Sequence, residues 1–195
     1  MESVTILKAD PRFLFLSWVI QARAEDQTRC HITGFLVEND NKDQLWIATD
    51  GRRLHTFRLE DGKDSLPVGN ARIILANKDS IVFEPDCADM GQFPQWRRVI
   101  PTLTNAGKQY KNAEGPITLP SRSFSLKKSG TMELANTIRD IAKKTQRTFD
   151  PFFLLPLADS AWTLYGDTND PENHALEFQS NGKTCVIMPI HSAED

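Results

Sequence analysis

Two neighbouring runs of alternating apolar and polar residues predict a β-hairpin near position 50. Residues 45–49 alternate at the period of a pleated strand, and residues 54–59 alternate in the same way. Asp50 and Gly51 lie between the two runs, and this dipeptide favours a tight turn because glycine adopts positive φ at little cost. The pattern therefore predicts a strand, a turn and a second strand in a half-buried sheet.

Two helices are predicted, one before and one after this hairpin. The first spans residues 10–24, with an aspartate as N-cap and Pro11 at the first helical position, and its nearly uniform apolarity predicts that it is well buried. Trp18 on this helix is expected in the core rather than at a ligand site. The second helix spans residues 132–146, where apolar residues recur at helical spacing, and the polar stretch 102–115 is expected to be an exposed linker. Further strands are predicted at 4–7, 31–38, 71–76, 80–83, 117–126, 152–157, 161–166, 174–179 and 183–190.

The composition is that of an ordinary globular protein. The 195 residues are 39% hydrophobic and 25% charged, which is enough for one domain of good size or two small ones. The net charge of -3 excludes a bulk polycation, so nucleic-acid binding would need a local basic patch. No apolar run approaches the ~20 residues that span a bilayer, and the N-terminus lacks a signal-peptide pattern, so no membrane partner is expected. The three cysteines, Cys30, Cys87 and Cys185, are far apart and are expected to be free thiols of a cytoplasmic protein.

No catalytic arrangement of residues stands out. The four histidines are isolated, and neither His-x-x-x-His nor Cys-x-x-Cys spacing occurs. The chain also lacks a Gly-x-Ser-x-Gly motif and a phosphate-binding glycine loop. We therefore expect a protein that is not an enzyme, with no cofactor and no metal.

Three short motifs occur in order along the chain. Residues 48–54 are Ala-Thr-Asp-Gly-Arg-Arg-Leu, residues 93–101 are Phe-Pro-Gln-Trp-Arg-Arg-Val-Ile-Pro, and residues 185–190 are Cys-Val-Ile-Met-Pro-Ile. The first resembles the second-domain signature of bacterial sliding clamps, the β subunit of DNA polymerase III. The second resembles the segment that joins the clamp's second and third domains, and the third resembles the clamp's C-terminal end. Because the clamps of this family are longer, the resemblance implies a shortened, clamp-like protein.

The resemblance also implies a fold class and a division of the chain. The fold would be α+β, of the sliding-clamp (processivity-factor) type, with two helices packed on antiparallel β-sheets in two half-domain units. The first clamp-like half, a strand, a helix and a hairpin, would span residues 1–60, and the second half would span residues 116–195. Residues 61–115 would hold connecting strands, the linking segment and a loop.

In the clamp family, partner proteins insert a short linear motif into a surface pocket. Its walls come from the three motif segments, and the matching positions here are Thr49, Gly51, Arg52, Arg53, Leu54, Pro94, Arg98, Val99, Val186, Met188, Pro189 and Ile190. The apolar side chains would give an adaptable floor, and Arg53 and Arg98 can hold a carboxylate or backbone carbonyls at the rim. The alternative is that these are buried sheet residues that any such fold needs. Arg52 stands where the family often has histidine, and Ile190-His191 replaces the usual Met-Arg, which leaves the identity of the partner open.

Clamps also line their bore with helices whose exposed faces carry lysine and arginine. The region of the second predicted helix has few acids and carries the basic residues Lys127, Lys128, Arg139, Lys143, Lys144 and Arg147. Such a stripe can lie against the phosphates of double-stranded DNA without reading its sequence. The alternative is a solvated helix face with cations near its C-terminal end.

These features together predict a non-enzymatic, clamp-like protein of DNA replication or repair. It would bind short linear motifs of DNA polymerase or repair proteins and would contact DNA when assembled as a homo-oligomer. Two other functions stay open. One is a stand-alone adaptor or decoy that binds such motifs without encircling DNA, and the other is a degenerate structural protein whose pocket binds nothing.

Overall fold

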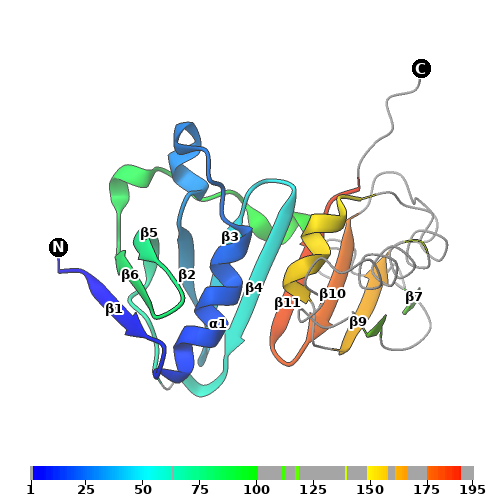
Figure 1. Cartoon of the computed structure of the whole chain (residues 1–195), viewed down its shortest axis with the longest axis horizontal. Helices are drawn as coiled ribbons and strands as arrows, with labels where there is room; N and C mark the ends of the chain where they lie inside the picture. The colour runs from blue at the N-terminus through cyan, green and yellow to red at the C-terminus, as the bar shows by residue number, and fades with distance from the viewer. Residues whose placement is uncertain are drawn as a thin grey trace. The chain divides into compact units, whose positions relative to one another are not determined.

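The chain divides into two compact units, which are described separately. Unit 1 comprises Met1–Trp96 with Gly182–Cys185, and unit 2 comprises Arg97–Asn181 with Val186–Asp195. The computed structural model (Figure 1) describes residues 2–62, 64–100, 111–112, 117–118, 139, 149–157, 161–166 and 175–189. The half-domain division predicted from the resemblance to clamps differs from these two units. It stays a prediction, with the ranges 1–60, 61–115 and 116–195.

Unit 1 contains one α-helix, α1 (Pro11–Val19), which η1 (Ile20–Ala22) continues as a 3-10 turn. The Oδ1 atom of Asp10 accepts a hydrogen bond from Arg12 N at 2.8 Å, so the predicted N-cap and first position are confirmed. Trp18 is buried as expected. The expectation that the whole helix is buried is wrong for Leu14, whose side chain is 65% exposed, because only one face of α1 packs on the sheet.

The strands of unit 1 form an antiparallel sheet. They are β1 (Val4–Leu7), β2 (Phe35–Asp40), β3 (Asp43–Thr49), β4 (Arg53–Leu59), β5 (Gly69–Ala76) and β6 (Ser80–Glu84). Their order is β1-β6-β5-β2-β3-β4, and the start of β11 (Lys183–Ile187) follows β4. Helix α1 packs against β3 and β4 (Figure 1). The side chains of unit 1 that are almost completely buried include Ile6, Leu16, Ile32, Phe35, Trp46, Ile47, Leu54, Ile81 and Phe83.

The hairpin predicted from the alternating pattern is confirmed. Thr49 pairs with Leu54, and Ile47 pairs with Thr56, so β3 and β4 enclose the Asp50–Gly51 turn. The prediction of a strand from residue 31 is wrong at its start. Gln27–Ile32 forms the 3-10 segment η2, because the side chain of Asp26 accepts from Thr28 N at 2.9 Å and caps a helical turn there.

Unit 2 contains further antiparallel strands and a 3-10 helix. The strands are β7 (Lys111–Asn112), β8 (Ile117–Thr118), β9 (Ala161–Gly166) and β10 (Leu176–Ser180). Their order is β11-β10-β9-β7, with β8 paired to β9. Trp162 and Phe178 are almost completely buried. Short 3-10 segments elsewhere in the chain are η3 (Glu60–Gly62), η4 (Ala88–Met90) and η5 (Trp96–Val99).

One predicted strand of unit 2 is wrong. The apolar run after Asp150 forms the 3-10 helix η6 (Pro151–Leu157) and not a strand over 152–157. Asp150 Oδ1 accepts from Phe152 N at 2.9 Å, and the Asp-Pro pair starts this helix as it starts α1. Pro156 has no N–H for a strand ladder, which disfavours a strand further. Of the second predicted helix only Arg139 is described, where the backbone is helical and the side chain exposed, and the predicted linker 102–115 lies almost entirely outside the described residues.

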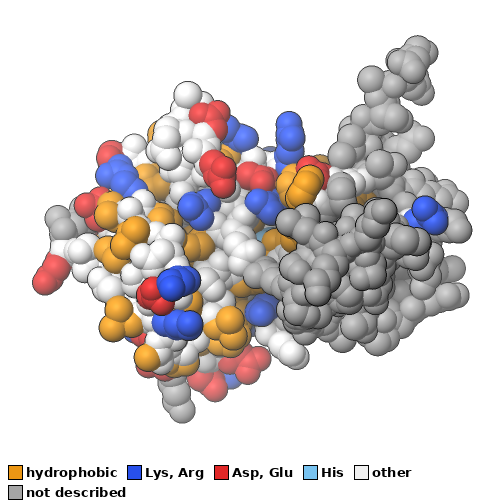
Figure 2. Space-filling view, in the orientation of Figure 1, with side chains coloured by type: hydrophobic (Ala, Val, Ile, Leu, Met, Phe, Trp, Pro, Cys, Tyr) orange, Lys and Arg blue, Asp and Glu red, His pale blue; other side chains and the backbone are white. Residues whose placement is uncertain are grey.

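Two properties of the described residues bear on function. No helix among them is long and apolar enough to cross a membrane. On the face in Figure 2, basic, acidic and apolar side chains of unit 1 are interspersed, without a broad field of one sign. Nucleic-acid binding by the face seen there would therefore depend on a local group of cations.

Candidate functional site

The turn between β3 and β4 is closed by its own side chains. Thr49 Oγ1 donates to Arg53 O at 2.7 Å and accepts from Gly51 N at 3.0 Å. Asp50 Oδ1 accepts from the backbone N–H groups of Arg52 and Arg53 at 2.8 and 2.9 Å, and Asp50 Oδ2 accepts from Arg53 Nε at 3.0 Å. Gly51 has φ +87°, a backbone conformation that strains any residue with a Cβ. The sequence Thr-Asp-Gly-x-Arg therefore builds a rigid turn from local hydrogen bonds.

Arg29, in η2, is a residue that sequence reasoning missed. Its Nη1 atom donates to the carbonyl of Asp50 at 2.8 Å, and its Nη2 atom lies 2.7 Å from where a Cβ on residue 51 would stand. The guanidinium therefore lies directly against the glycine of the turn. No local pattern indicates this contact, because the two partners are 21 positions apart.

The turn carries more positive than negative charge among its described members. Arg29 and Arg52 are exposed, whereas Arg53 is half-buried and paired with Asp50. Asp50 is the one carboxylate that these contacts involve. Exposed guanidinium groups beside a rigid turn are suited to binding a carboxylate or a row of backbone carbonyls.

The first half of the C-terminal strand lies beside this hairpin, within unit 1. The backbone N–H of Arg58 donates to the carbonyl of Gly182 at 2.8 Å. Cys185 is completely buried, and this burial raises the pKa of its thiol well above its usual range. The charge of Arg53 lowers that pKa and the charge of Asp50 raises it, so both groups lie within electrostatic reach of the sulfur. β11 therefore starts next to the strand that leaves the Asp50–Gly51 turn.

The predicted pocket residues fall on both units. Thr49, Gly51, Arg52, Arg53, Leu54 and Pro94 belong to unit 1, and Arg98, Val99, Val186, Met188 and Pro189 belong to unit 2. Ile190 lies outside the described residues.

Their exposure is mixed. Leu54 and Val186 are buried, at 2% and 1% exposure, whereas Val99 is 41% exposed. Met188 and Pro189 are half-buried. A buried leucine or valine is expected both at the floor of a pocket and in the core of an ordinary sheet. Burial alone therefore does not distinguish the two interpretations.

The linking segment presents its predicted residues at the surface. Phe93 and Trp96 are buried, and Trp96 N donates to Pro94 O at 2.7 Å. Pro94, Arg98 and Val99 are exposed. The two buried aromatic side chains hold the segment in place. The side chains of Pro94, Arg98 and Val99 stay accessible to solvent.

The predicted DNA-contacting residues are mostly outside the described part of the chain. Arg139 is exposed and helical, while Lys127, Lys128, Lys143, Lys144 and Arg147 lie outside it. Among the described residues, no group of three or more His, Cys, Asp or Glu side chains is arranged to hold a metal ion. Cys30 is an exposed free thiol, and Cys87 and Cys185 are buried free thiols.

No protein-family model matches the sequence, and no curated protein matches it. Solved structures that it resembles include bacterial sliding clamps. The β subunit of DNA polymerase III from Thermotoga maritima matches 98% of this chain over 66% of its own length, at 14% identity and a TM-score of 0.58. The C. crescentus β sliding clamp, solved with PEG bound, has 13% sequence identity to this chain and a TM-score of 0.60. The match covers 98% of this chain and 66% of the clamp chain. The DnaN sliding clamp from Bartonella birtlesii, bound to griselimycin, matches 97% of this chain over 66% of its own, at 14% identity and a TM-score of 0.55.

The chain thus has the α+β sliding-clamp fold in a shortened form, and the fold class expected from the three motifs is confirmed. It spans just under two thirds of the length of these neighbours. A structural likeness at identities this low shows the fold alone, whereas activity and partners depend on the particular residues at the site.

Proposed function

We propose that this chain is a non-enzymatic, clamp-like protein of DNA replication or repair, which binds short linear motifs of DNA polymerase or repair proteins. The observation that carries this proposal is a fold shared with sliding clamps over 98% of the chain. The three clamp-like motifs on that fold, 48–54, 93–101 and 185–190, add to its weight. We place the protein in the cytoplasm, and we retain the half-domain division into 1–60, 61–115 and 116–195 as part of the same proposal.

The local geometry of the candidate residues supports a peptide-binding role. The turn at Gly51 is held rigid before any ligand arrives, which lowers the entropy cost of binding. Exposed Arg29 and Arg52 offer donors for a peptide carboxylate or its backbone carbonyls. Val99 and Met188 offer apolar area that is still accessible, and methionine adapts to partners of different shape.

Two of the structural neighbours contain bound ligands. The Bartonella birtlesii clamp is bound to griselimycin, and a Borrelia burgdorferi clamp is in complex with a natural product. We propose that this chain likewise offers a ligand site on the same fold, formed by the residues predicted from the motifs.

Calorimetric titration with a short clamp-binding peptide tests the proposal. We expect micromolar affinity, about -8 kcal/mol, because a few buried side chains must offset the lost freedom of the peptide. Val99→Asp should weaken binding by about tenfold or more, because it places a carboxylate in an apolar contact. Val99 suits this test better than Leu54, whose 2% exposure means that Leu54→Asp would damage the fold itself.

Val68→Asp is the matched control. Val68 is a valine of similar exposure, 49% against 41% for Val99, and it belongs to none of the three motifs. We expect it to leave the affinity unchanged. Equal affinities for the wild type and Val99→Asp would mean that the peptide binds elsewhere. No measurable heat with the folded wild type would support the degenerate protein with a dead pocket.

A second candidate is a stand-alone adaptor or decoy that binds such motifs without encircling DNA. The observation that favours it is the face of unit 1 in Figure 2, where basic and acidic side chains are interspersed without a broad positive field that would attract DNA. Mass in solution separates the two functions, since a ring that contacts DNA would be a homo-oligomer and a decoy would be a monomer.

A further inference from the structure

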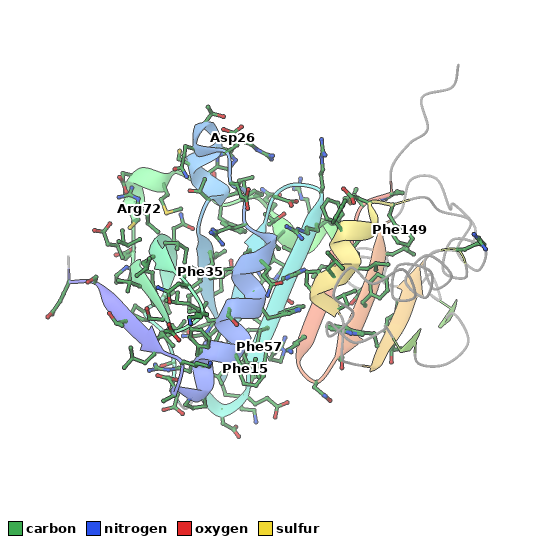
Figure 3. The ribbon with its side chains drawn as sticks, in the orientation of Figure 1. Phe15, Asp26, Phe35, Phe57, Arg72 and Phe149 are labelled. Atoms are coloured by element: carbon green, nitrogen blue, oxygen red, sulfur yellow. The ribbon has the colours of Figure 1, made fainter. Side chains whose placement is uncertain are left out.

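Two aromatic side chains of α1 stack on two side chains of β4. Phe15 lies parallel to Phe57, with ring centroids 4.2 Å apart and 10° between the planes. Both residues are labelled in Figure 3. Trp18 lies parallel to His55, with centroids 4.3 Å apart and 8° between the planes. Phe15 and Trp18 are three positions apart on the helix, and His55 and Phe57 are two positions apart on the strand. The two helix residues therefore share one face of α1, and the two strand residues share one face of β4. Helix α1 is therefore joined to β4 by two stacked ring pairs.

The His55 ring is also held by a hydrogen bond. Its Nδ1 atom lies 2.9 Å from the carbonyl oxygen of Trp18, and the imidazole is completely buried. Because a carbonyl oxygen only accepts, Nδ1 carries the proton of this bond. The stacked pair of Trp18 and His55 thus has a fixed tautomer and a fixed orientation.

The ammonium of Lys183 lies over both aromatic residues of α1. Lys183 Nζ is 5.4 Å from the centroid of Trp18 and 5.7 Å from that of Phe15, which is within the range of cation–π attraction. Lys183 is half-buried and is the first residue of β11. The start of the C-terminal strand is therefore attached to α1 through one lysine side chain and two rings.

We infer that Lys183 is a positioning residue, which fastens the start of β11 to α1 and thereby steadies the strand that leads into Val186, Met188 and Pro189 of the proposed binding set. β11 runs without interruption from Lys183 to Ile187, so a displacement of its first residue is passed along the strand. Met188 and Pro189 follow directly. Lys183 itself is not in the set of residues proposed to touch the partner peptide, and this inference rests on the proposed function of that set.

Two substitutions of Lys183 separate its charge from its bulk. Lys183→Met keeps an unbranched apolar chain and removes the cation, whereas Lys183→Arg keeps a cation that can lie over the rings. Lys42→Met is the matched control, because the Lys42 ammonium is exposed and paired with Asp61 at 3.0 Å. All variants are compared in the full chain.

The first measurement is amide hydrogen exchange in β11, with β2 of the same molecule as reference. Lys183→Met should speed exchange in β11 by about threefold to tenfold relative to β2, as expected for the loss of a partly desolvated cation–π contact. Lys183→Arg and Lys42→Met should leave this ratio unchanged. An unchanged ratio in Lys183→Met, or equal acceleration in β2 and β11, would overturn the inference.

The second measurement is the affinity for the clamp-binding peptide. Lys183→Met should weaken it by about threefold to tenfold, and Lys183→Arg should restore it. Faster exchange of β11 with an unchanged affinity would show that Lys183 does not position the site. A wild type that binds no peptide would contradict the proposed function, while the exchange ratio would still decide whether Lys183 fastens β11.

Discussion

Arg29 Nη1 donates a hydrogen bond to the backbone carbonyl of Asp50 at 2.8 Å, across 21 positions of the sequence. This contact attaches the 3-10 segment η2 to the tip of the β3–β4 hairpin. It also places a guanidinium directly over Gly51, where no side chain blocks the approach. The turn is therefore held both by its own side chains and by a residue from outside the hairpin.

Gly51→Ala should destabilise the protein by about 1–2 kcal/mol. The cost has two sources, the φ of +87° that an L-residue disfavours and a Cβ 2.7 Å from Arg29 Nη2. Chemical denaturation measures the change in the free energy of unfolding. In the Arg29→Ala background the same substitution should cost less, because the guanidinium is gone and only the backbone strain remains. Equal costs in the two backgrounds would mean that Arg29 does not press on the turn.

Asp10→Asn should reduce the loss of stability in acid. The hydrogen bond from the Arg12 side chain holds the pKa of Asp10 below its ordinary value. An acid whose pKa is lowered by folding stabilises the protein above its unfolded pKa of about 4, and this contribution is lost as the pH falls through the folded pKa. Asparagine keeps an oxygen that can cap Arg12 N but cannot form the ion pair.

Denaturation midpoints measured from pH 7 to pH 2 check this sign. At pH 7 the denaturation midpoint of the wild type should be higher than that of Asp10→Asn. Near pH 2 the two midpoints should converge. The contacts of Asp43 with Arg58 and of Asp89 with Arg72 also lower the pKa of each carboxyl, so Asp10→Asn should still lose some stability in acid. A difference between wild type and variant that stays constant with pH would contradict the prediction.

Gln44→Leu should destabilise unit 1 by about 2–4 kcal/mol. Gln44 is 2% exposed, and its Oε1 accepts from Leu66 N at 2.7 Å and from Trp46 Nε1 at 2.8 Å. Its Nε2 donates to Leu66 O at 2.9 Å. Leucine would leave these buried groups without their partner, and each such loss is costly. Gln92→Leu, at an exposed position, is the control and should change the free energy of unfolding by less than about 0.5 kcal/mol.

DNA binding by the isolated protein should be weak and sensitive to salt. If the predicted helix neutralises ~5 phosphates, the slope of log affinity against log salt would be about -4 to -5. Reversing the charge of Lys143 and Lys144 should remove most of the binding, as measured by fluorescence anisotropy with duplex DNA. Reversing the charge of Lys42 and Lys78, at exposed positions of unit 1, changes the net charge of the protein by the same amount. This control should have little effect on the affinity for DNA. Tight binding that is insensitive to salt would show that this helix is wrongly assigned to DNA.

Much of the local structure could be predicted because its causes lie within a few residues. Asp10 and Pro11 start α1, and Asp50 with Gly51 turns the hairpin, each by a preference of its own backbone and side chain. The same signal is present at Asp150 and Pro151, yet the apolar run after it also fits a strand, and the structure has the 3-10 helix η6 there. In a continuous apolar run, no alternation with polar residues reveals a period of 2 or of 3.6. The pattern alone therefore does not distinguish a buried strand from a helix.

The candidate site was only partly predictable. The three motifs name residues of the turn, the linking segment and the C-terminal strand, but they do not name Arg29 or Lys183. Arg29 acts on a backbone carbonyl, and Lys183 acts on two rings of a helix near the other end of the chain. Neither contact leaves a periodic or composition signal.

The sequence by itself determined the hairpin, the start of α1 and the three motifs that point to the sliding-clamp fold. Each depends on steric limits, alternation or capping between residues close in the chain. Only the tertiary structure decided that Arg29 covers Gly51, that Cys185 is buried near Arg53 and Asp50, and that Lys183 lies over Phe15 and Trp18. These contacts join segments far apart in sequence, and they form because burying the apolar faces of α1 and the sheet brings those segments together.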